Sequence, residues 1–305
     1  MKILVTGASG FVGSKLIPEL LREGYEVHAL VRDPTKIQHQ PWAAQVDIIR
    51  GSLPATHNPC DAIDVVIHLA GLAHVASSRA ELQVHNFDAS ITLAQQAKAA
   101  GVKRLVFISS SKARYPEHSA YAKVKLETEQ QLLALQEPDL FEVVCLRPGL
   151  LYGAGMKGNL AGLLRMLEKQ FLPIFISSTN TIGMLGVRDF CRAITLAVTT
   201  GGLEGQIWDV SDNEIYTLDT IVARVRHYLG YKMPLVTVPK HMVKRCAAFA
   251  ELLAPVYKSS FSLSTYKTIF EENYEANVRF KALTHFNAED NFYTALPFLL
   301  KSKHL

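Results

Sequence analysis

The 305-residue sequence predicts an α/β fold, in which a doubly wound parallel sheet is joined to a smaller, mainly helical C-terminal lobe. Two observations favour this class. Short apolar segments alternate with amphipathic segments through residues 1–150, which is the pattern of consecutive strand–helix–strand units. Beyond residue 150 the alternation stops, and helical patterns separated by glycine-rich loops follow. We therefore expect one domain over residues 1–150 and a second, smaller lobe over residues 151–305.

The elements of the first domain follow from these apolar segments. The segment 64–70 (DVVIHLA) is almost continuously apolar, as is typical of a parallel strand that is buried on both faces. Ser119 is the expected N-cap of one helix, and Pro18 is expected to kink another helix or to remove one of its hydrogen bonds. We expect strands at 3–5, 26–31, 46–50, 64–70, 104–108 and 142–146, and helices at 11–23, 87–100 and 119–136.

The second half has a less regular pattern. A late strand at 206–210 is expected to return to the sheet, and the other segments are expected to form a lobe over its mouth, where such folds bind ligands. Helices are predicted at 160–170, 187–199, 218–229 and 242–253, with an irregular helical pattern from residue 261 onward.

Composition narrows the class of protein. The net charge is +4, but lysines and arginines are scattered, which indicates a small anionic ligand and excludes a basic nucleic-acid surface. No apolar run reaches the roughly 18 residues needed to span a bilayer, so no membrane partner is expected. A first strand at residue 3 leaves no room for a cleaved signal peptide, and the four cysteines have no metal-like spacing. We expect no metal and a cytoplasmic location.

A glycine-rich turn follows the first strand and opens into a helix. The sequence is Thr6-Gly-Ala-Ser-Gly-Phe-Val-Gly13, with glycines three residues apart. The first glycine permits a sharp turn, the second lets the backbone approach a pyrophosphate, and the third lets helix pack on strand. Free N–H groups at the helix start then face the phosphates. This Rossmann-type turn predicts cofactor contacts at Gly7, Ser9, Gly10, Phe11, Val12 and Gly13.

The end of the second strand indicates which dinucleotide is bound. An acidic side chain at this position would bind both ribose hydroxyls of NAD, whereas a guanidinium pairs with the 2′-phosphate of NADP. Arg32 follows the expected strand tip at Val31, so we expect NADP as the preferred cofactor. NAD stays open as the alternative, because a shift in register would bring Asp33 to the ribose.

A chemically active pattern begins at Ser109-Ser110-Ser111, which end the fifth strand. Tyr121 and Lys125 follow four residues apart, so they project from one face of the next helix. An ammonium beside a phenol favours the phenolate, so Lys125 is expected to lower the pKa of Tyr121 and make it an acid/base near neutral pH. Lys125 is also placed to hold the nicotinamide ribose, and a serine hydroxyl to polarise a substrate oxygen.

Together these motifs resemble the extended short-chain dehydrogenase/reductase superfamily, in its NAD(P)-dependent nucleotide-sugar epimerase/dehydratase family. The resemblance covers nearly the whole chain and includes HLAG at 68–71, RPGLLYG at 147–153 and GMKGN at 155–159. It implies a catalytic set of Ser111, Tyr121 and Lys125. It also implies cofactor contacts at Leu69, Ala70, Gly71, Asn86 and Pro148. Substrate contacts are expected at His74, Ser111, Lys157 and Asn159, and Arg279 is a candidate for the family's diphosphate arginine.

The sequence departs from the family at several places. Tyr121 follows Ser111 by ten residues, where family members have a longer loop, and Gly51-Ser-Leu replaces the usual G-D-L. We expect a nucleotide-sugar epimerase or keto-sugar reductase that uses Tyr121 as acid/base on a UDP-sugar. The alternatives are an NADPH-dependent reductase of a small non-nucleotide carbonyl compound, and a non-catalytic NADP-binding regulator or assembly subunit. The resemblance further implies a homodimer formed through the helices at 88–100 and 119–136.

Overall fold

The structure is a computed structural model of the chain. It describes residues 1–54, 58–72, 77–169, 174–176, 180–231, 236–238 and 277–301. The helix expected at 242–253, most of the helical pattern expected from residue 261 onward, and the candidate substrate residue His74 lie outside the described residues.

A seven-stranded parallel sheet forms the centre of the protein, in the order β11-β6-β5-β4-β1-β2-β3. The predicted doubly wound sheet is confirmed. The chain leaves β1 in one direction through β2 and β3 and in the other through β4, β5 and β6. This order places the topological switch point, where such sheets bind ligands, between β1 and β4. The strands are β1 (Lys2–Thr6), β2 (Glu26–Val31), β3 (Asp47–Arg50), β4 (Val65–His68), β5 (Arg104–Ile108), β6 (Glu142–Pro148) and β11 (Gln206–Val210).

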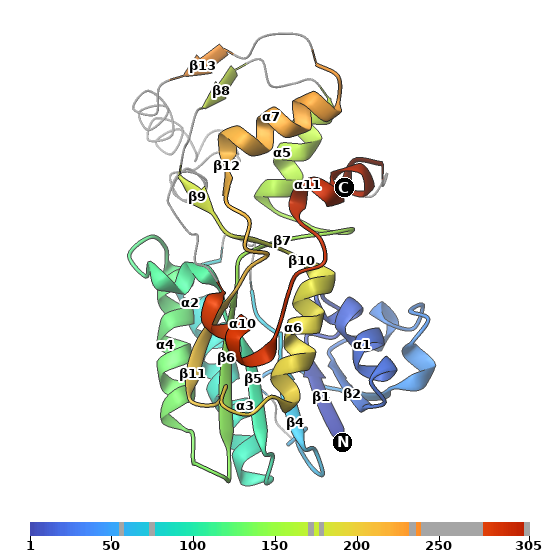
Figure 1. Ribbon diagram of the computed structural model, residues 1–305. Helices are drawn as coiled ribbons and strands as arrows, with labels where there is room; N and C mark the ends of the chain where they lie inside the picture. The colour runs from blue at the N-terminus through green and yellow to red at the C-terminus, as the bar shows by residue number, and fades with distance from the viewer. Residues whose placement is uncertain are drawn as a thin grey trace.

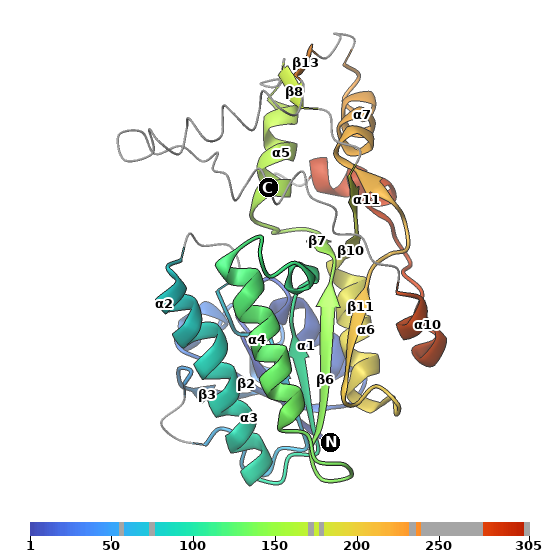
Figure 2. The same ribbon diagram turned by 90° about the vertical axis from the view of Figure 1, so that its left-hand side faces the viewer.

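Helices cover both faces of this sheet. Figure 2 shows α2 (Arg79–Leu82), α3 (Ala89–Ala99) and α4 (Ala120–Ala134) in front of the sheet and α1 (Gly13–Arg22) behind it. α6 (Val187–Thr199) packs against α1. Ser119 caps α4 as predicted, since its side chain accepts a hydrogen bond from Ala122 N at 3.1 Å. Pro18 is accommodated within α1, whose Leu16, Ile17 and Leu20 enter the core.

The helix expected at 87–100 begins earlier in the structure. A capping box between Ser78 and Glu81 starts α2, and a π-helical segment, η3 (Gln83–Asp88), connects α2 to α3. Reciprocal bonds between a serine and a glutamate three residues later are a strong helix start, whereas the apolar periodicity begins only near Phe87. Three short 3₁₀ helices complete this half: η1 (Pro34–Lys36), η2 (Ala43–Gln45) and η4 (Ser111–Arg114).

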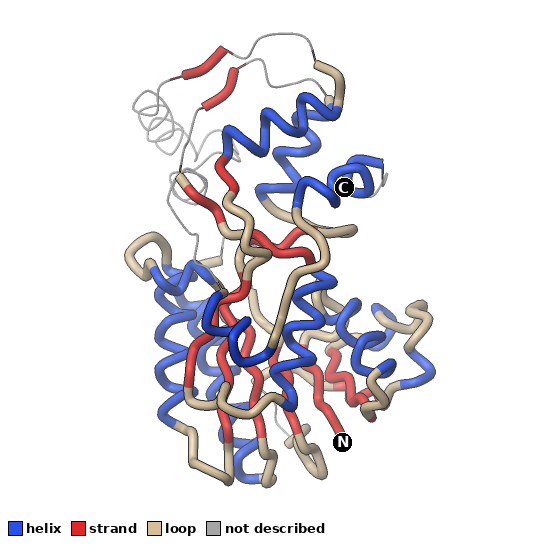
Figure 3. The backbone as a smooth tube through the Cα atoms, in the orientation of Figure 1, coloured by secondary structure: helices blue, strands red, loops and turns tan. Residues whose placement is uncertain are grey.

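The other elements build a smaller unit beyond the carboxyl ends of the strands (Figure 1). Its apolar cluster joins Leu164 of α5, Ile221 of α7 and Phe292 of α11. Its helices are α5 (Asn159–Glu168), α7 (Leu218–Tyr228) and α11 (Phe292–Lys301), whereas α10 (Val278–Thr284) packs on β11 of the sheet. The strands pair as β7 (Leu150–Tyr152) with β10 (Met184–Gly186), β9 (Thr181–Ile182) with β12 (Tyr216–Thr217), and β8 (Ile174–Ile176) with β13 (Val236–Val238). Figure 3 shows β7, β9, β10 and β12 lying between the sheet and these helices, and β8 and β13 at the far end of the unit.

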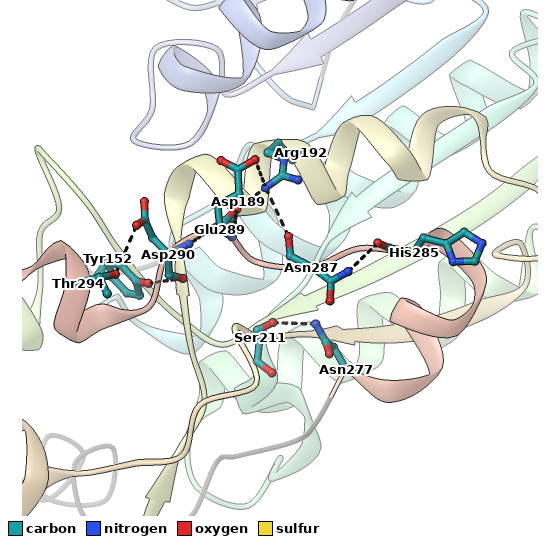
Figure 4. Close-up of polar contacts among 10 residues, drawn as sticks. All are labelled: Tyr152, Asp189, Arg192, Ser211, Asn277, His285, Asn287, Glu289, Asp290 and Thr294. Atoms are coloured by element: carbon teal, nitrogen blue, oxygen red, sulfur yellow. Dashed lines mark hydrogen bonds and ion pairs between the residues drawn. The ribbon is translucent and has the colours of Figure 1, made fainter.

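A group of hydrogen bonds holds the segment 285–291, which leads from α10 to α11, against the start of α6 (Figure 4). The Asp189 carboxylate accepts hydrogen bonds from Glu289 N at 3.1 Å and Asp290 N at 3.3 Å. Arg192 donates to Asp189 at 2.8 Å, and the Tyr152 hydroxyl donates to Asp290 O at 3.3 Å. The C-terminal segment is thereby tied to both units. Among the described residues, no helix combines the length and hydrophobicity needed to cross a bilayer.

Candidate cofactor and catalytic site

The backbone conformation and close contacts of the glycine turn require glycine at two of its positions. Gly7 has φ +71°, and a Cβ there would lie 2.9 Å from Ala70 N. A Cβ at Gly13 would lie 2.4 Å from Gly7 O, and Gly10 N donates to Gly7 O at 2.9 Å. The turn therefore lies directly against the segment that follows β4, across the switch point of the sheet. Only residues without a side chain fit this close approach.

A directional chain of hydrogen bonds fixes the segment after β4. Ser90 Oγ donates to Asn86 O, so it accepts from His68 Nε2 at 2.9 Å. His68 Nδ1 then accepts from Thr6 Oγ1 at 2.7 Å, and Thr6 Oγ1 accepts from Ala70 N at 3.2 Å. Burial lowers the pKa of His68 to about 3, so the ring is neutral. His68 is thus a structural link between β1, β4 and the helix that carries Ser90.

Asn86 completes this arrangement from the π-helical segment η3. Its Oδ1 accepts from Leu72 N at 2.7 Å, and its Nδ2 donates to Leu72 O at 3.1 Å. A Cβ at Gly71 would lie 3.2 Å from Asn86 Oδ1. These hydrogen bonds hold the segment 69–71 beside the glycine turn. The side-chain amide of Asn86 thereby fixes the conformation of the turn formed by Leu69, Ala70 and Gly71. π-Helical turns occur frequently at functional sites, which agrees with this position.

The adenosine end of the candidate site is marked by two arginines. Arg32 follows β2 and is exposed, and no described carboxylate pairs with it. Arg50 ends β3 in register with Val31 of β2. One oxygen of the Asp33 carboxylate, Oδ1, accepts hydrogen bonds from Thr35 N at 3.1 Å and from Thr35 Oγ1 at 2.7 Å. These hydrogen bonds lower the pKa of Asp33, and Asp33 caps η1.

The three serines have different environments. Ser109 is 5% exposed, and its buried Oγ has no hydrogen-bond partner among the described residues. Ser110 caps η4 by accepting from Lys112 N at 3.3 Å, and its side chain hydrogen-bonds that of Tyr121. Ser111 is the first residue of η4 and is partly buried. The serine that contacts Tyr121 is therefore Ser110, one position before the serine that the resemblance selects.

Tyr121 and Lys125 are brought together with the end of β5, but not in the electrostatic state that the sequence predicts. Lys125 Nζ donates to Ile108 O at 2.8 Å and lies 4.5 Å from the centre of the Phe107 ring. Burial raises the pKa of Tyr121 to about 12 and lowers that of Lys125 to about 8. The expectation that Lys125 lowers the pKa of Tyr121 is wrong for this structure. Desolvation outweighs the neighbouring charge, and the ammonium bonds a main-chain carbonyl.

The expected substrate residues Lys157 and Asn159 are exposed at the start of α5. The N-cap residue of this ten-residue helix is Gly158, which has φ +90°. Because glycine has no side chain, the first N–H groups of the helix receive no hydrogen bond from an N-cap side chain. A Cβ at Gly153, where this loop begins, would lie 3.7 Å from the Phe11 ring. The loop therefore starts beside the glycine turn and ends at a helix terminus that favours anions.

Pro148 and Arg279 occupy opposite ends of the strands. Pro148 ends β6, in register with Val210 of β11 and next to the strand that carries the serines. Arg279 instead lies on α10, where its guanidinium is 5.0 Å from the Trp208 ring and donates to Gln206, the first residue of β11. Because Gln206 lies at the amino ends of the strands, the candidate role of Arg279 in binding a diphosphate is wrong.

The residues present fit a dinucleotide. Glycines leave space where a Cβ would clash, Val12 at the N-cap of α1 provides no side-chain cap for the helix N–H groups, and Ser109 Oγ is buried without a described partner. All three features lie at the carboxyl edge of the sheet, as do Tyr121 and Lys125. This combination of fold and site defines an NAD(P)-dependent enzyme of the extended short-chain dehydrogenase/reductase type.

Comparison with known proteins identifies the family. The model of the NAD dependent epimerase/dehydratase family matches residues 3–211, and the chain belongs to this family. A UDP-glucose 4-epimerase of Vibrio cholerae is 32% identical over 232 residues, covering 69% of this chain and 70% of the relative. A ceramide reductase of Caulobacter vibrioides is 30% identical over 250 residues, covering 78% and 73%.

Solved structures confirm the fold. The UDP-glucuronic acid 4-epimerase of Bacillus cereus, in complex with NAD, superposes with a TM-score of 0.77 at 18% identity and covers 99% of this chain and 100% of that one. MoeE5 in complex with UDP-glucose and NAD gives a TM-score of 0.75 at 22% identity, covering 99% and 98%. Both matches extend over the C-terminal unit as well as the sheet.

Proposed function

We propose that the protein is an NADP(H)-dependent enzyme that transfers a hydride at a carbon of a UDP-linked sugar, with Tyr121 exchanging the proton of the oxygen on that carbon. The observation that carries this proposal is that the partly buried Tyr121 and the buried Lys125 lie at the same edge of the sheet as the glycine turn, with Ser110 bonded to Tyr121. Ser109 Oγ, Lys125 and Pro148 lie at the edge where the nicotinamide of such a cofactor is bound. The nicotinamide, when bound, supplies or accepts the hydride.

The protonation state of Tyr121 favours reduction of a keto-sugar. With a pKa of about 12, the phenol keeps its proton at neutral pH. A protonated phenol is ready to donate to a carbonyl oxygen, which becomes the hydroxyl as the hydride reaches the carbon. Ser110, which bonds the phenol, would hold the same oxygen in place. Epimerisation is the alternative outcome, and it requires Tyr121 first to accept a proton from a hydroxyl.

The choice of NADP rests on the charges beside the adenosine end. Arg32 has no described acidic partner, Arg50 lies on the adjacent strand end, and the Asp33 carboxylate is bonded to Thr35. Two guanidinium groups at these strand ends suit a 2′-phosphate, although the Arg50 charge also acts on the Asp33 carboxylate. NAD binding would instead use a carboxylate that receives the ribose hydroxyls, and Asp33 is the residue for that role.

The uridine diphosphate is assigned to the start of α5. Lys157, the exposed Asn159 and a helix N-terminus without a side-chain cap form a combination that attracts a diphosphate. The similarity to a UDP-glucose 4-epimerase supports the same substrate class. A carbonyl compound without a nucleotide is the second candidate, favoured by the comparable similarity to a ceramide reductase and by the short segment between Ser111 and Tyr121.

Two experiments test this function. Thermal-shift measurements with UDP, UDP-sugars, NADP and NAD are expected to show stabilisation by NADP and by uridine nucleotides. No stabilisation by any uridine nucleotide would remove the UDP-sugar assignment and leave the second candidate. Tyr121→Phe should abolish turnover and leave cofactor binding intact, and unchanged turnover would refute the mechanism. Tyr25→Phe, at the amino end of the sheet, is the matched control.

The remaining proposals concern the setting in which the enzyme works. A homodimer would form through α3 and α4, which lie on one face of the sheet and pack against each other (Figure 2). Sedimentation velocity tests this, and a monomer at micromolar concentration would contradict it. Cys60, Cys145 and Cys191 are free and buried, which suits the reducing cytoplasm.

A further inference from the structure

A row of charged groups extends from the catalytic pair into the interior. Tyr121, Lys125 and Glu129 follow one another at four-residue spacing on α4, so they lie on one helix face. Glu129 is fully buried, and it receives two hydrogen bonds from the Arg147 guanidinium, one from Nε at 2.8 Å and one from Nη2. Arg147 is on β6, directly before Pro148. The ion pair therefore lies one helical turn behind Lys125.

The row continues to the serines. Asp209 of β11 is in register with Arg147 of β6. Arg114 of η4 donates to the Asp209 carboxylate at 2.6 Å. Because η4 begins at Ser111 and is capped by Ser110, this ion pair anchors the turn that touches Tyr121. The signs alternate along Lys125, Glu129, Arg147, Asp209 and Arg114, and the row joins the two halves of the candidate catalytic set.

Stability alone does not account for a fully buried ion pair. Removing two charges from water costs several kcal/mol per ion, and apolar residues of similar volume often stabilise a protein equally or better. Strands β5 and β6 carry another ion pair at their amino ends, where Arg104 Nε donates to the partly exposed Glu142 at 2.6 Å. Arg104 also bonds main-chain carbonyls at the end of α6, and the pair lies at the end of the strands opposite to the serines. Glu129 differs from Glu142 because the preceding turn of its helix, α4, carries Lys125.

The groups facing Lys125 come from four elements. They are the carboxylate of Glu129 on α4, the thiol of Cys145 on β6, the ring of His68 on β4 and the carbonyl of Ile108 on β5. Burial lowers the pKa of Lys125, and the charge of Glu129 opposes this. His68 is neutral and the Cys145 thiol is protonated, since burial raises its pKa. Glu129 is thus the carboxylate that keeps Lys125 charged.

We propose that Glu129, held by Arg147, is a positioning residue that keeps the Lys125 ammonium protonated and directed at the end of β5 while the enzyme turns over. Asp209 and Arg114 extend the same network and fix the serine turn against α4. The role of Lys125 in turnover rests on the proposed function, whereas its protonation state does not. The network thereby maintains Lys125 as a cation in a place where burial alone would favour the neutral amine.

The test measures the titration of Lys125 directly. Protein labelled with ¹³C at lysine Cε is titrated by NMR, and the Lys125 resonance is assigned by its loss in Lys125→Met. In the wild type the midpoint is expected at about 8. In Glu129→Gln it should fall by about one unit, as expected when a nearby opposite charge is lost. The alkaline limb of kcat/KM for NADPH and a UDP-linked keto-sugar should move by the same amount.

Two further variants keep the result decisive. Glu129→Gln leaves Arg147 buried without its partner, so the double variant Glu129→Gln/Arg147→Met is measured as well. Its midpoint should also fall, by less than in the single variant because the guanidinium charge is lost together with the carboxylate. Glu142→Gln, which removes the partner of Arg104, is the matched control and should leave the Lys125 midpoint unchanged. An unshifted midpoint in the double variant overturns the inference. A shifted midpoint without wild-type turnover supports the inference and rejects the proposed function.

Discussion

Asp212 gives the structure a pH-dependent stability that a single substitution should remove. Its carboxylate accepts from the Tyr216 hydroxyl at 2.6 Å, the Tyr152 hydroxyl at 3.4 Å and Glu214 N at 3.1 Å. The Tyr216 oxygen in turn accepts from Phe292 N at 2.9 Å. Asp212 therefore lies where the C-terminal helix α11 joins the smaller unit. Burial raises the pKa of Asp212 from 3.8 to about 6 in spite of these hydrogen bonds.

The sign of the effect follows from proton binding. Between about pH 4 and pH 6 the folded protein binds a proton at Asp212 that the unfolded chain has lost, so stability decreases as the pH rises through this interval. A shift of about two units corresponds to at most about 3 kcal/mol. Because water partly reaches this carboxylate, we expect about 1 to 2 kcal/mol at neutral pH. Asp212→Asn removes the charge and should stabilise the protein by that amount.

Urea unfolding of the wild type and Asp212→Asn, measured from about pH 4 to pH 8, tests this reasoning. The difference in the free energy of unfolding should be near zero at about pH 4 and reach its full value above about pH 6. Asp61→Asn, at an exposed aspartate, should show no such pH dependence. A variant that is less stable at every pH would show that the hydrogen bonds to the tyrosines outweigh the cost of the buried charge.

Three other substitutions test the site and the core. Gly13→Ala should abolish NADPH binding, measured by nicotinamide fluorescence, because its Cβ would lie 2.4 Å from Gly7 O, whereas Gly162→Ala, with no atom within 4 Å, should bind normally. Arg32→Ala should weaken NADPH binding about tenfold or more and leave NADH binding unchanged, since the lost charge-assisted bonds go to the 2′-phosphate; equal loss for both cofactors would contradict the assignment. Leu164→Ala, at a fully buried residue of α5, should lower the free energy of unfolding by about 2 to 5 kcal/mol, and a loss below about 1 kcal/mol would mean that the cluster collapses around the cavity.

The central sheet could be predicted because its strands are apolar enough to be recognised alone. DVVIHLA contains β4, and residues 104–108 and 206–210 form strands with the predicted bounds. β7, β9, β10 and β12 were not predicted as strands, since two or three residues show no alternation of apolar and polar side chains. Each of these strands pairs with a segment far along the chain, so the pairing is a property of tertiary contact.

In the candidate site, the positions of the residues could likewise be predicted from local sequence patterns, whereas properties that depend on tertiary packing could not. Tyr121, Lys125 and the glycine turn were located by spacing, and the structure places them at one edge of the sheet. The direction of the pKa shift of Tyr121 was not predictable, because it depends on how much protein surrounds the phenol. A sequence shows that a lysine lies one helical turn away, but desolvation comes from β5, β6 and α4 together. The contact of Ser110 with Tyr121 likewise follows from how η4 is capped.

The short segment between the serines and Tyr121 has a consequence for substrate contacts. Ser110 caps η4, Ser119 caps α4, and the rings of Tyr115 and His118 stack at 5.1 Å between these caps. Arg114 is meanwhile held by Asp209. These contacts join η4 to α4 across the short segment, so the contact of Ser110 with Tyr121 needs no longer insertion. Under the proposed function, we expect the remaining substrate contacts at the loop 153–158, which leads into α5.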